Sequence, residues 1–187
     1  MFMNIIKTPI EGLLIIEPAV FKDARGYFVE TYNEQRYNEA GITAKFVQDN
    51  QSCSSYGVVR GLHFQRPPYS QAKLVCCTRG RVLDVAVDLR KNSSTFGQWF
   101  SVELNEENHR QFFIPQGFAH GFSVLSEVAI FTYKCDNFYH PEAEGGILLS
   151  DETLNIDWQV PMEQRILSDK DTKHPLLKDF NLSTFDF

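Results

Sequence analysis

The stretch from residue 73 to residue 89 constrains the fold most, because it joins two strand-like runs through a defined turn. Apolar residues dominate both runs, and Arg79-Gly80 separates them, which is the pattern of a β-hairpin. Successive side chains of a strand point to opposite faces of its sheet. In the second run one face is therefore entirely apolar, whereas the other mixes apolar residues with Asp84 and Asp88. The pattern predicts a strand with two unlike faces.

Short strands separated by Gly, Pro and Asn residues fill most of the remaining chain. Further strands are expected at residues 12–18, 27–32, 45–51, 98–104, 110–114, 118–125 and 128–135. Turns or loops are expected at residues 23–26, 52–57 and 142–146. Many short strands with frequent turns indicate an antiparallel sandwich or barrel. The chain has no GxGxxG motif, P-loop or strand–helix alternation, so nothing supports a nucleotide-binding α/β fold.

Only one clear helix is expected in the first half of the chain. It covers residues 34–40, where Asn33 can cap the first turn and Gly41 can end the last one. After about residue 141 the pattern weakens, and a short helix is expected around residues 176–180. We see no internal repeat, low-complexity run or linker in the chain.

Length and charge narrow the class of function. The chain has 187 residues, which suits a single domain over 1–187 with a C-terminal tail, about residues 160–187, packed on the barrel. A net charge of −6 offers no basic footprint for nucleic acid or an anionic membrane. The N-terminus lacks the apolar core of a signal peptide, and no apolar run reaches the ~18 residues of a membrane span. Cys76 beside Cys77 suits neither a disulfide pair nor a CxxC site, so we expect reduced thiols and a soluble, cytoplasmic protein.

Two segments resemble the metal-binding boxes of cupin barrels. Residues 115–120 read Pro-Gln-Gly-Phe-Ala-His, which is the PxGxxH form of the second box. In the first box, His63 is followed two residues later by Gln65 instead of a histidine, and no glutamate lies between Gln65 and Gly80. Lys73 would bring a cation, which repels a divalent ion. We therefore expect the pocket of such a barrel without its metal, with a metal-dependent oxygenase or isomerase as an alternative.

The same region suits acid–base chemistry beside a ketone. The imidazole of His63 can take a proton near neutral pH, provided that a carboxylate fixes its tautomer. Lys73 can place positive charge where an enolate oxygen develops, and Tyr133 can return a proton to the opposite face of the carbon. Taken one at a time, each is more often structural: a hydrogen-bonded histidine, a packed tyrosine or a lysine at a strand end. From spacing alone, their assembly is a hypothesis.

Eight segments of the chain resemble the dTDP-4-dehydrorhamnose 3,5-epimerase family, a group of metal-independent cupins. They are 21–30 (FKDARGYFVE), 46–50 (FVQDN), 59–65 (VRGLHFQ), 82–90 (VLDVAVDLR), 94–98 (STFGQ), 114–122 (IPQGFAHGF), 133–135 (YKC) and 167–171 (LSDKD). Several are long, and they occur together in order along nearly the whole chain. The resemblance is therefore specific.

The resemblance implies a mainly β fold, namely a cupin-type jelly-roll antiparallel β-barrel with a few short helices. It also implies that His63 is the general base, Tyr133 the proton donor and Asp171 the carboxylate that orients the histidine. Lys73 and His120 match pocket residues around the reacting sugar, with Lys73 placed to stabilise the enolate. The positions that match substrate-holding residues of the family are Arg25, Glu30, Gln48, Asp49, Asn50, Arg60, His120, Glu144 and Lys170.

For function, the resemblance implies epimerisation of dTDP-4-dehydro-6-deoxy-D-glucose at C3 and C5 to dTDP-4-dehydro-L-rhamnose, without metal, NAD or flavin. It also implies a homodimer in which Arg25 and Glu30 serve the partner's pocket. Two alternatives stay open: a single-site epimerase of a related dTDP-ketodeoxysugar, and a sugar-nucleotide-binding cupin without catalysis. The chain departs from the usual family residues at Cys76, where arginine is common, and at Leu149-Ser150-Asp151.

Overall fold

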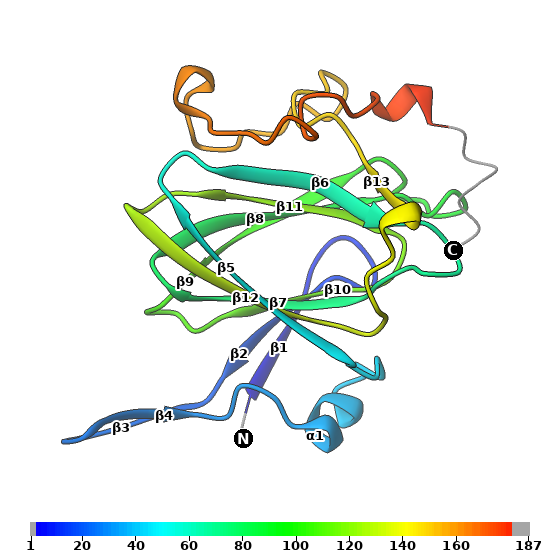
Figure 1. Ribbon diagram of the computed structural model, residues 1–187. Helices are drawn as coiled ribbons and strands as arrows, with labels where there is room; N and C mark the ends of the chain where they lie inside the picture. Colours follow the sequence, from blue (N-terminus) through cyan, green and yellow to red (C-terminus); the bar gives the residue numbers. More distant parts are fainter. Residues whose placement is uncertain (1–2, 181–187) are drawn as a thin grey trace.

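Two antiparallel sheets face each other and form most of the molecule (Figure 1). The structure is a computed structural model that describes residues 3–180. The larger sheet has the order β1 (Met3–Lys7), β2 (Leu14–Pro18), β10 (Gln111–Ile114), β7 (Lys73–Arg79), β12 (Val128–Cys135) and β5 (Gln48–Ser55). The smaller sheet has the order β13 (Glu144–Gly146), β6 (Val59–Gln65), β11 (Phe118–Val124), β8 (Arg81–Asp88) and β9 (Trp99–Asn105). A separate hairpin pairs β3 (Val20–Asp23) with β4 (Gly26–Val29).

The described residues contain only short helical pieces. They are the α-helix α1 (Glu34–Glu39) and the 3₁₀ turns η1 (Pro141–Ala143), η2 (Met162–Gln164) and η3 (Leu177–Asp179). Asn33 caps α1 as predicted, because its side chain accepts a hydrogen bond from the backbone N–H of Arg36. The short helix expected near the C-terminus is the turn η3. The predicted mainly β, cupin-type jelly roll with a few short helices is confirmed.

The hairpin predicted over residues 73–89 is wrong. β7 lies between β10 and β12 in the larger sheet, whereas β8 lies between β11 and β9 in the smaller one. Arg79-Gly80 therefore carries the chain from one sheet to the other. Gly80 has a φ of +75°, and a Cβ atom there would fall 2.0 Å from the carbonyl oxygen of Val128. The local pattern located the turn correctly, but it carried no information about which strands pair.

The two faces of β8 belong to different layers of the molecule. Its mixed face looks into the space between the sheets, where Val82 and Ala86 are part of the central core. Asp84 lies fully buried on the same face. The entirely apolar face looks outward, and the segment that follows β13 covers it, with Val85 and Trp158 in one buried cluster. The polar groups of this strand thus lie inside the molecule, where they can serve a site.

Three other segments differ from the prediction. Residues 52–57 are mostly strand, because β12 offers β5 a pairing partner as far as Ser55. Residues 142–146 end in β13, whose Gly146 pairs with His63 of β6. The sequence pattern does not reveal β1, which pairs along its whole length with β2. Partners that are distant in the chain decide such segments, and a local pattern does not contain them.

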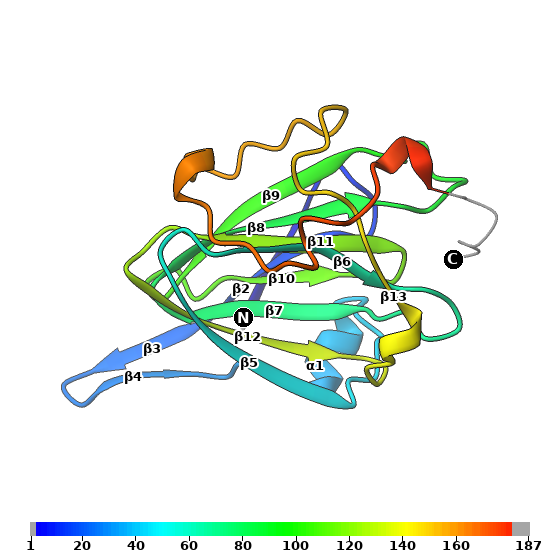
Figure 2. The ribbon, with the colours of Figure 1, turned by 45° about the horizontal axis from the view of Figure 1, so that its top comes forward.

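The segment after β13 forms a third layer over the smaller sheet (Figure 1, Figure 2). Trp158 is fully buried in it, and the indole N–H donates a hydrogen bond to the carbonyl oxygen of Leu149. From β11, the hydroxyl of Ser123 donates to the carbonyl oxygen of Trp158. Residues 160–180 of the expected C-terminal tail lie in this layer, and residues 181–187 lie outside the described part of the chain.

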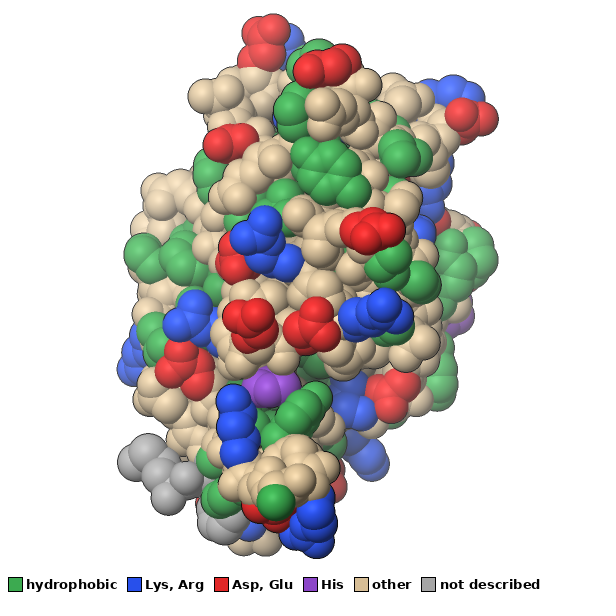
Figure 3. Space-filling view, turned by 90° about the vertical axis from the view of Figure 1, so that its left-hand side faces the viewer, with side chains coloured by type: hydrophobic (Ala, Val, Ile, Leu, Met, Phe, Trp, Pro, Cys, Tyr) green, Lys and Arg blue, Asp and Glu red, His purple; other side chains and the backbone are tan. Residues whose placement is uncertain are grey.

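None of the described helices is long and apolar enough to cross a membrane. On the face shown in Figure 3, acidic and basic side chains are interspersed over the surface. As far as the described residues cover it, that face offers no extended basic field to a nucleic acid.

Trp158 is expected to hold the C-terminal segment on the sheet. Replacing it with alanine (Trp158→Ala) removes a fully buried indole, so the free energy of unfolding should fall by about 3–5 kcal/mol. Urea denaturation measures this change. Met162→Ala in the same segment is the control, because Met162 is 71% exposed and its loss should change the free energy by less than about 0.5 kcal/mol. Equal effects of the two substitutions would contradict the role given to the indole.

Candidate active site

A cavity of about 430 Å³ opens between the two sheets. The smaller sheet contributes side chains from β6, β11 and β13, and the larger sheet contributes side chains from β5, β7 and β12. The predicted site residues that line it are Gln48, Asn50, Arg60, His63, Lys73, His120, Tyr133, Glu144 and Lys170. Residues that are far apart in the sequence therefore converge on one cavity.

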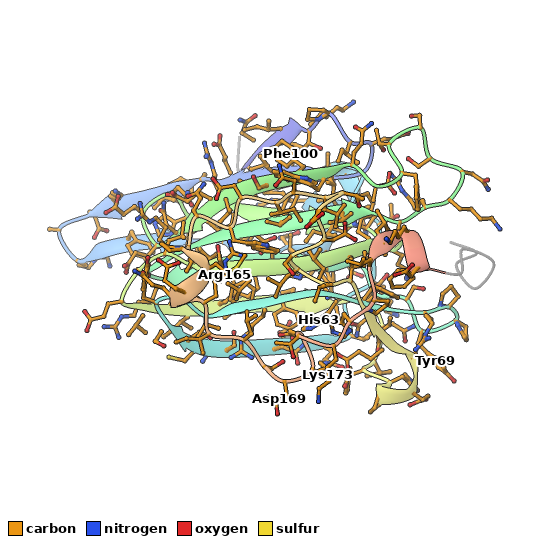
Figure 4. The ribbon with its side chains drawn as sticks, turned by 90° about the horizontal axis from the view of Figure 1, so that it is seen from above. His63, Tyr69, Phe100, Arg165, Asp169 and Lys173 are labelled. Atoms are coloured by element: carbon orange, nitrogen blue, oxygen red, sulfur yellow. The ribbon has the colours of Figure 1, made fainter. Side chains whose placement is uncertain are left out.

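His63 and Asp171 form a hydrogen-bonded pair beside this cavity. The distance between Nε2 of His63 and Oδ1 of Asp171 is 2.5 Å, and the carboxylate side chain is only 3% exposed. Burial alone would raise the pKa of Asp171, but the hydrogen bonds from His63 and Ser168 and the charge on His63 hold that pKa below its usual range. In Figure 4, His63 lies beside the segment that carries Asp169 and Lys173, the segment to which Asp171 belongs. Nδ1, the other ring nitrogen of His63, does not take part in the contact with Asp171.

Two glycines bring β6 and β11 close together next to His63. A Cβ atom on Gly61 would fall 2.6 Å from the Cα atom of Gly121, so side chains here would push the strands apart. His63 and His120 are register partners across these strands, and the register shifts directly after His120. The close approach sets two imidazoles opposite each other at the cavity wall.

His120 is more deeply buried than His63 and has its own carboxylate. Its Nε2 atom lies 2.9 Å from Oδ2 of Asp84, which is fully buried on the inner face of β8. Burial lowers the pKa of His120, which keeps the imidazole neutral. A neutral imidazole next to a buried carboxylate is a fixed polar wall for a ligand.

Tyr133 and Lys73 reach the cavity from the sheet opposite His63. Tyr133 lies on β12 and Lys73 on β7, and both strands belong to the larger sheet. Burial, aided by the nearby Cys135, raises the pKa of Tyr133, so the side chain is a phenol at neutral pH. Burial lowers the pKa of Lys73, while the nearby acidic groups, Asp84 and Glu144 among them, oppose this shift. The cavity therefore has an imidazole on one side and a phenol and a lysine on the other.

Three of the predicted substrate-holding residues lie outside this cavity. Asp49 is on the opposite face of β5 from Gln48 and Asn50, and it pairs with Lys134 at 2.9 Å. Arg25 lies in the turn between β3 and β4, where its side chain is 89% exposed and pairs with Asp23. Glu30 follows β4 and pairs with Arg36. The structure does not bring these three into the cavity of their own chain.

Gln65 has a structural role that the sequence analysis did not identify. Its amide N–H group donates to the carbonyl oxygens of Tyr69 and Phe138, and its oxygen accepts from the backbone N–H of His140. Gln65 stands where metal-binding cupins have a second histidine, and here it connects two loops beside the cavity. Tyr139, also missed, lines the cavity and donates to Glu144 at 2.9 Å. Its only signal in the sequence was its position four residues after a lysine–cysteine pair, which is too weak to use.

One group of side chains among the described residues has the composition of a metal site: His63, Asp171 and His174, whose ligand atoms lie within 4.8 Å of one another. Two ligands of one tetrahedral zinc ion, each about 2.0–2.1 Å from it, lie roughly 3.3 Å apart. His63 and Asp171 are closer, at 2.5 Å. Their contact fits a hydrogen bond and does not fit two ligands of one ion.

The chain matches known proteins along nearly its whole length. Residues 7–179 match the family described as dTDP-4-dehydrorhamnose 3,5-epimerase. The dTDP-4-dehydrorhamnose 3,5-epimerase of Shigella flexneri is 56% identical over 170 residues, which cover 90% of this chain and 93% of that protein.

Solved structures agree with the sequence match. The crystal structure of dTDP-4-dehydrorhamnose 3,5-epimerase from Elizabethkingia anophelis NUHP1 has a TM-score of 0.93 and 56% identity, and covers 97% of this chain and 100% of that one. The dTDP-6-deoxy-D-glucose-3,5-epimerase of Legionella pneumophila Philadelphia 1, in complex with dTDP-4-keto-L-rhamnose, has a TM-score of 0.94 and 52% identity, and covers 98% and 97%. The family match covers residues 7–179, and relatives that align over nearly their whole length share more than half of the aligned residues with this chain. This chain therefore belongs to the dTDP-4-dehydrorhamnose 3,5-epimerase family.

Proposed function

We propose that this chain is an isomerase that converts dTDP-4-dehydro-6-deoxy-D-glucose into dTDP-4-dehydro-L-rhamnose by inverting C3 and C5. The observation that carries the proposal is the arrangement of His63 and Tyr133 on facing sheets of one cavity, with Asp171 bonded to the imidazole. Inversion of a carbon requires a base on one side and an acid on the other. The cavity supplies both.

The first step is proton abstraction beside the C4 ketone. Nδ1 of His63 takes the proton from C3 or C5, the C–H electron pair forms the enolate double bond, and the ketone oxygen becomes an oxyanion. Asp171 stabilises the imidazolium that results, because its carboxylate lies against Nε2. Lys73 stabilises the oxyanion from the opposite wall.

The second step returns a proton to the other face of the same carbon. The phenol of Tyr133 gives its proton to the carbon and the enolate collapses to the ketone. Solvent then reprotonates the tyrosinate and takes the proton from the His63 imidazolium, which restores both groups. The raised pKa of Tyr133 keeps this donor protonated before the step. No net oxidation or reduction occurs, so the reaction needs no redox cofactor, and the ketone acidifies the C–H bonds without a metal.

The nucleotide end of the substrate requires cations and hydrogen-bond donors. Arg60 and Lys170 reach the cavity, and an arginine and a lysine suit the two phosphates of a dTDP-sugar. Gln48 and Asn50 provide amides on the β5 wall. Lys170 also pairs with Glu144 at 2.5 Å, which orients both side chains at the cavity mouth.

We further propose a homodimer that acts in the cytoplasm, in which the β3–β4 hairpin of each chain reaches the partner's cavity. The hairpin projects away from both sheets (Figure 1, Figure 2). It exposes large apolar side chains: Phe21 is 52%, Tyr27 60% and Phe28 67% exposed. Such side chains at the end of a projecting arm are typical of an interface. Arg25 at the hairpin turn and Glu30 then serve the partner's substrate.

The single-site alternative receives no support from the two departures from the family pattern. Cys76 lines a different pocket, on the outer face of the larger sheet, where its thiol contacts Thr132 at 3.0 Å. Leu149 is buried in the cluster beneath the C-terminal segment with Trp158. Neither side chain lines the cavity between the sheets, so neither departure changes the side chains that face the substrate.

His63→Ala should stop exchange of the sugar hydrogens with solvent. Loss of the base should slow deuterium uptake at C3 and C5 by about 10²–10⁴-fold, and proton NMR in D₂O follows each position separately. Uptake at the wild-type rate in this variant would rule out the role of His63. In the wild-type protein, uptake at one carbon would identify a single-site epimerase, and binding without uptake a non-catalytic protein.

Asp171→Asn should keep the shape of the pair but remove its charge. The amide does not stabilise an imidazolium, so kcat/KM should fall by about 10²–10⁴-fold. Asp169→Asn is the matched control, because Asp169 is an exposed carboxylate two residues away, and its loss should change kcat/KM less than twofold. A similar small effect of both substitutions would remove Asp171 from the mechanism.

A mixture of two inactive variants tests whether Arg25 serves the partner. In a dimer of one Arg25→Ala chain and one His63→Ala chain, the cavity of the Arg25→Ala chain receives an intact Arg25 from its partner. Random exchange of subunits should then restore about a quarter of the wild-type activity, with each variant alone nearly inactive. If Arg25 serves its own chain, mixing restores nothing.

A further inference from the structure

His174 lies beside the proposed base, three residues after Asp171 in the C-terminal segment. Its side chain is 12% exposed. The Nε2 atom is buried and has no hydrogen-bond partner among the described residues. A buried polar atom without a partner costs free energy, so a merely packed residue at this place would be better apolar.

Two imidazoles converge on one carboxylate oxygen. Nε2 of His174 lies 3.6 Å from Oδ1 of Asp171, the same oxygen that lies 2.5 Å from Nε2 of His63. The rings of His63 and His174 meet edge to face, with centroids 5.6 Å apart and planes inclined by 72°. At 3.6 Å the second contact is too long for a hydrogen bond, but it leaves the ring nitrogen next to the charge of the carboxylate.

The backbone of β13 leaves room for this ring. Gly146 pairs with His63 in the sheet, and a Cβ atom on Gly146 would fall 2.4 Å from Nε2 of His174. The imidazole therefore occupies the place that any larger residue at position 146 would take. The ring of His174 is thus held against β13, the strand that pairs with β6 beside His63. The fold therefore sets the distance between this ring and Asp171.

The surroundings favour a neutral imidazole at position 174. Burial lowers the pKa of His174, the neighbouring His63 and Lys170 lower it further, and Asp171 and Glu144 oppose them. These groups face the ring from β6, β13 and its own segment. A neutral ring next to a carboxylate turns an N–H toward it, because a ring lone pair at that position would be repelled.

We infer that His174 is a positioning residue that shares Asp171 with His63: its Nε2–H points at Oδ1 and draws charge from the oxygen that holds the base. Asp171 then stabilises the protonated form of His63 less strongly than it would alone. Without His174, Asp171 should hold a proton on His63 more tightly. This inference rests on the proposed function, in which His63 is the base.

Two substitutions separate this role from simple packing. His174→Leu fills a similar volume without any donor, and His174→Gln keeps an N–H donor near the place of Nε2. The acid limb of kcat/KM, measured from pH 5 to pH 9, should move upward by about half to one pH unit in His174→Leu, which is roughly a 3- to 10-fold loss on that limb. His174→Gln should restore most of the wild-type profile.

The competing results are distinct. If His174→Leu leaves the limb in place, or if both variants lose activity equally at every pH, then His174 only packs and the inference is overturned. Proton NMR of the His63 ring against pH in the substrate-free protein provides a second readout, and its titration should move in the same direction as the limb. This readout remains valid if the wild-type protein fails to exchange the sugar hydrogens, so the failure of the inference and that of the proposed function are distinguishable.

Discussion

A buried carboxylate requires a partner, and in this protein Asp171 finds its partner in His63, which lies 108 residues earlier in the chain. Leaving such a charge unpaired inside a protein costs several kcal/mol. The contact therefore ties the C-terminal segment to β6 at a fixed place. Because the same segment buries Trp158 and covers the apolar face of β8, the layer that completes the hydrophobic core also delivers the carboxylate. Stability and chemistry depend on one docking event.

The two-sheet architecture turns this pair into one half of a two-sided site. β6 belongs to the smaller sheet, whereas β7 and β12 belong to the larger one. Side chains that point inward from facing sheets meet across the space between them. This places an imidazole and a phenol on opposite walls of one cavity without any special loop. The close contact of Gly61 with Gly121 adds only the local adjustment that sets His63 opposite His120.

Charge in this molecule is organised locally. The chain carries a net charge of −6, yet Arg60, Lys73 and Lys170 all reach the same cavity. A cavity with converging cations suits an anionic small molecule better than an extended polyanion, because the net charge of the whole chain is negative. The basic side chains that cluster in the cavity, and not the net charge of the chain, are consistent with a nucleotide-linked substrate.

Sequence alone determined the features that depend on near neighbours. The cap of α1 at Asn33, the turn at Gly80 and the positions of most strands follow from local backbone preferences and alternation. The family resemblance also identified many of the residues that line the cavity. It could do so because related chains fold alike, so matching residues occupy matching places even when their packing cannot be worked out from the sequence. The resemblance placed His63, Tyr133 and Asp171 in one site before any geometry was available.

Only the tertiary structure decided which strands pair and which side chains face inward. β7 and β8 follow each other in the chain and yet belong to different sheets, since pairing depends on partners contributed by distant strands. Asp49 lies outside the cavity because successive side chains of β5 point to opposite faces of the sheet. A sequence motif that treats residues 48–50 as one block does not indicate which of them face the cavity. His174 acquired its surroundings from β6 and β13, and Gln65 acquired its partners Phe138 and His140 from a distant loop; no local pattern relates these groups to one another. Local preferences act over a few residues, whereas burial and hydrogen bonding act between surfaces that meet only after the chain has folded.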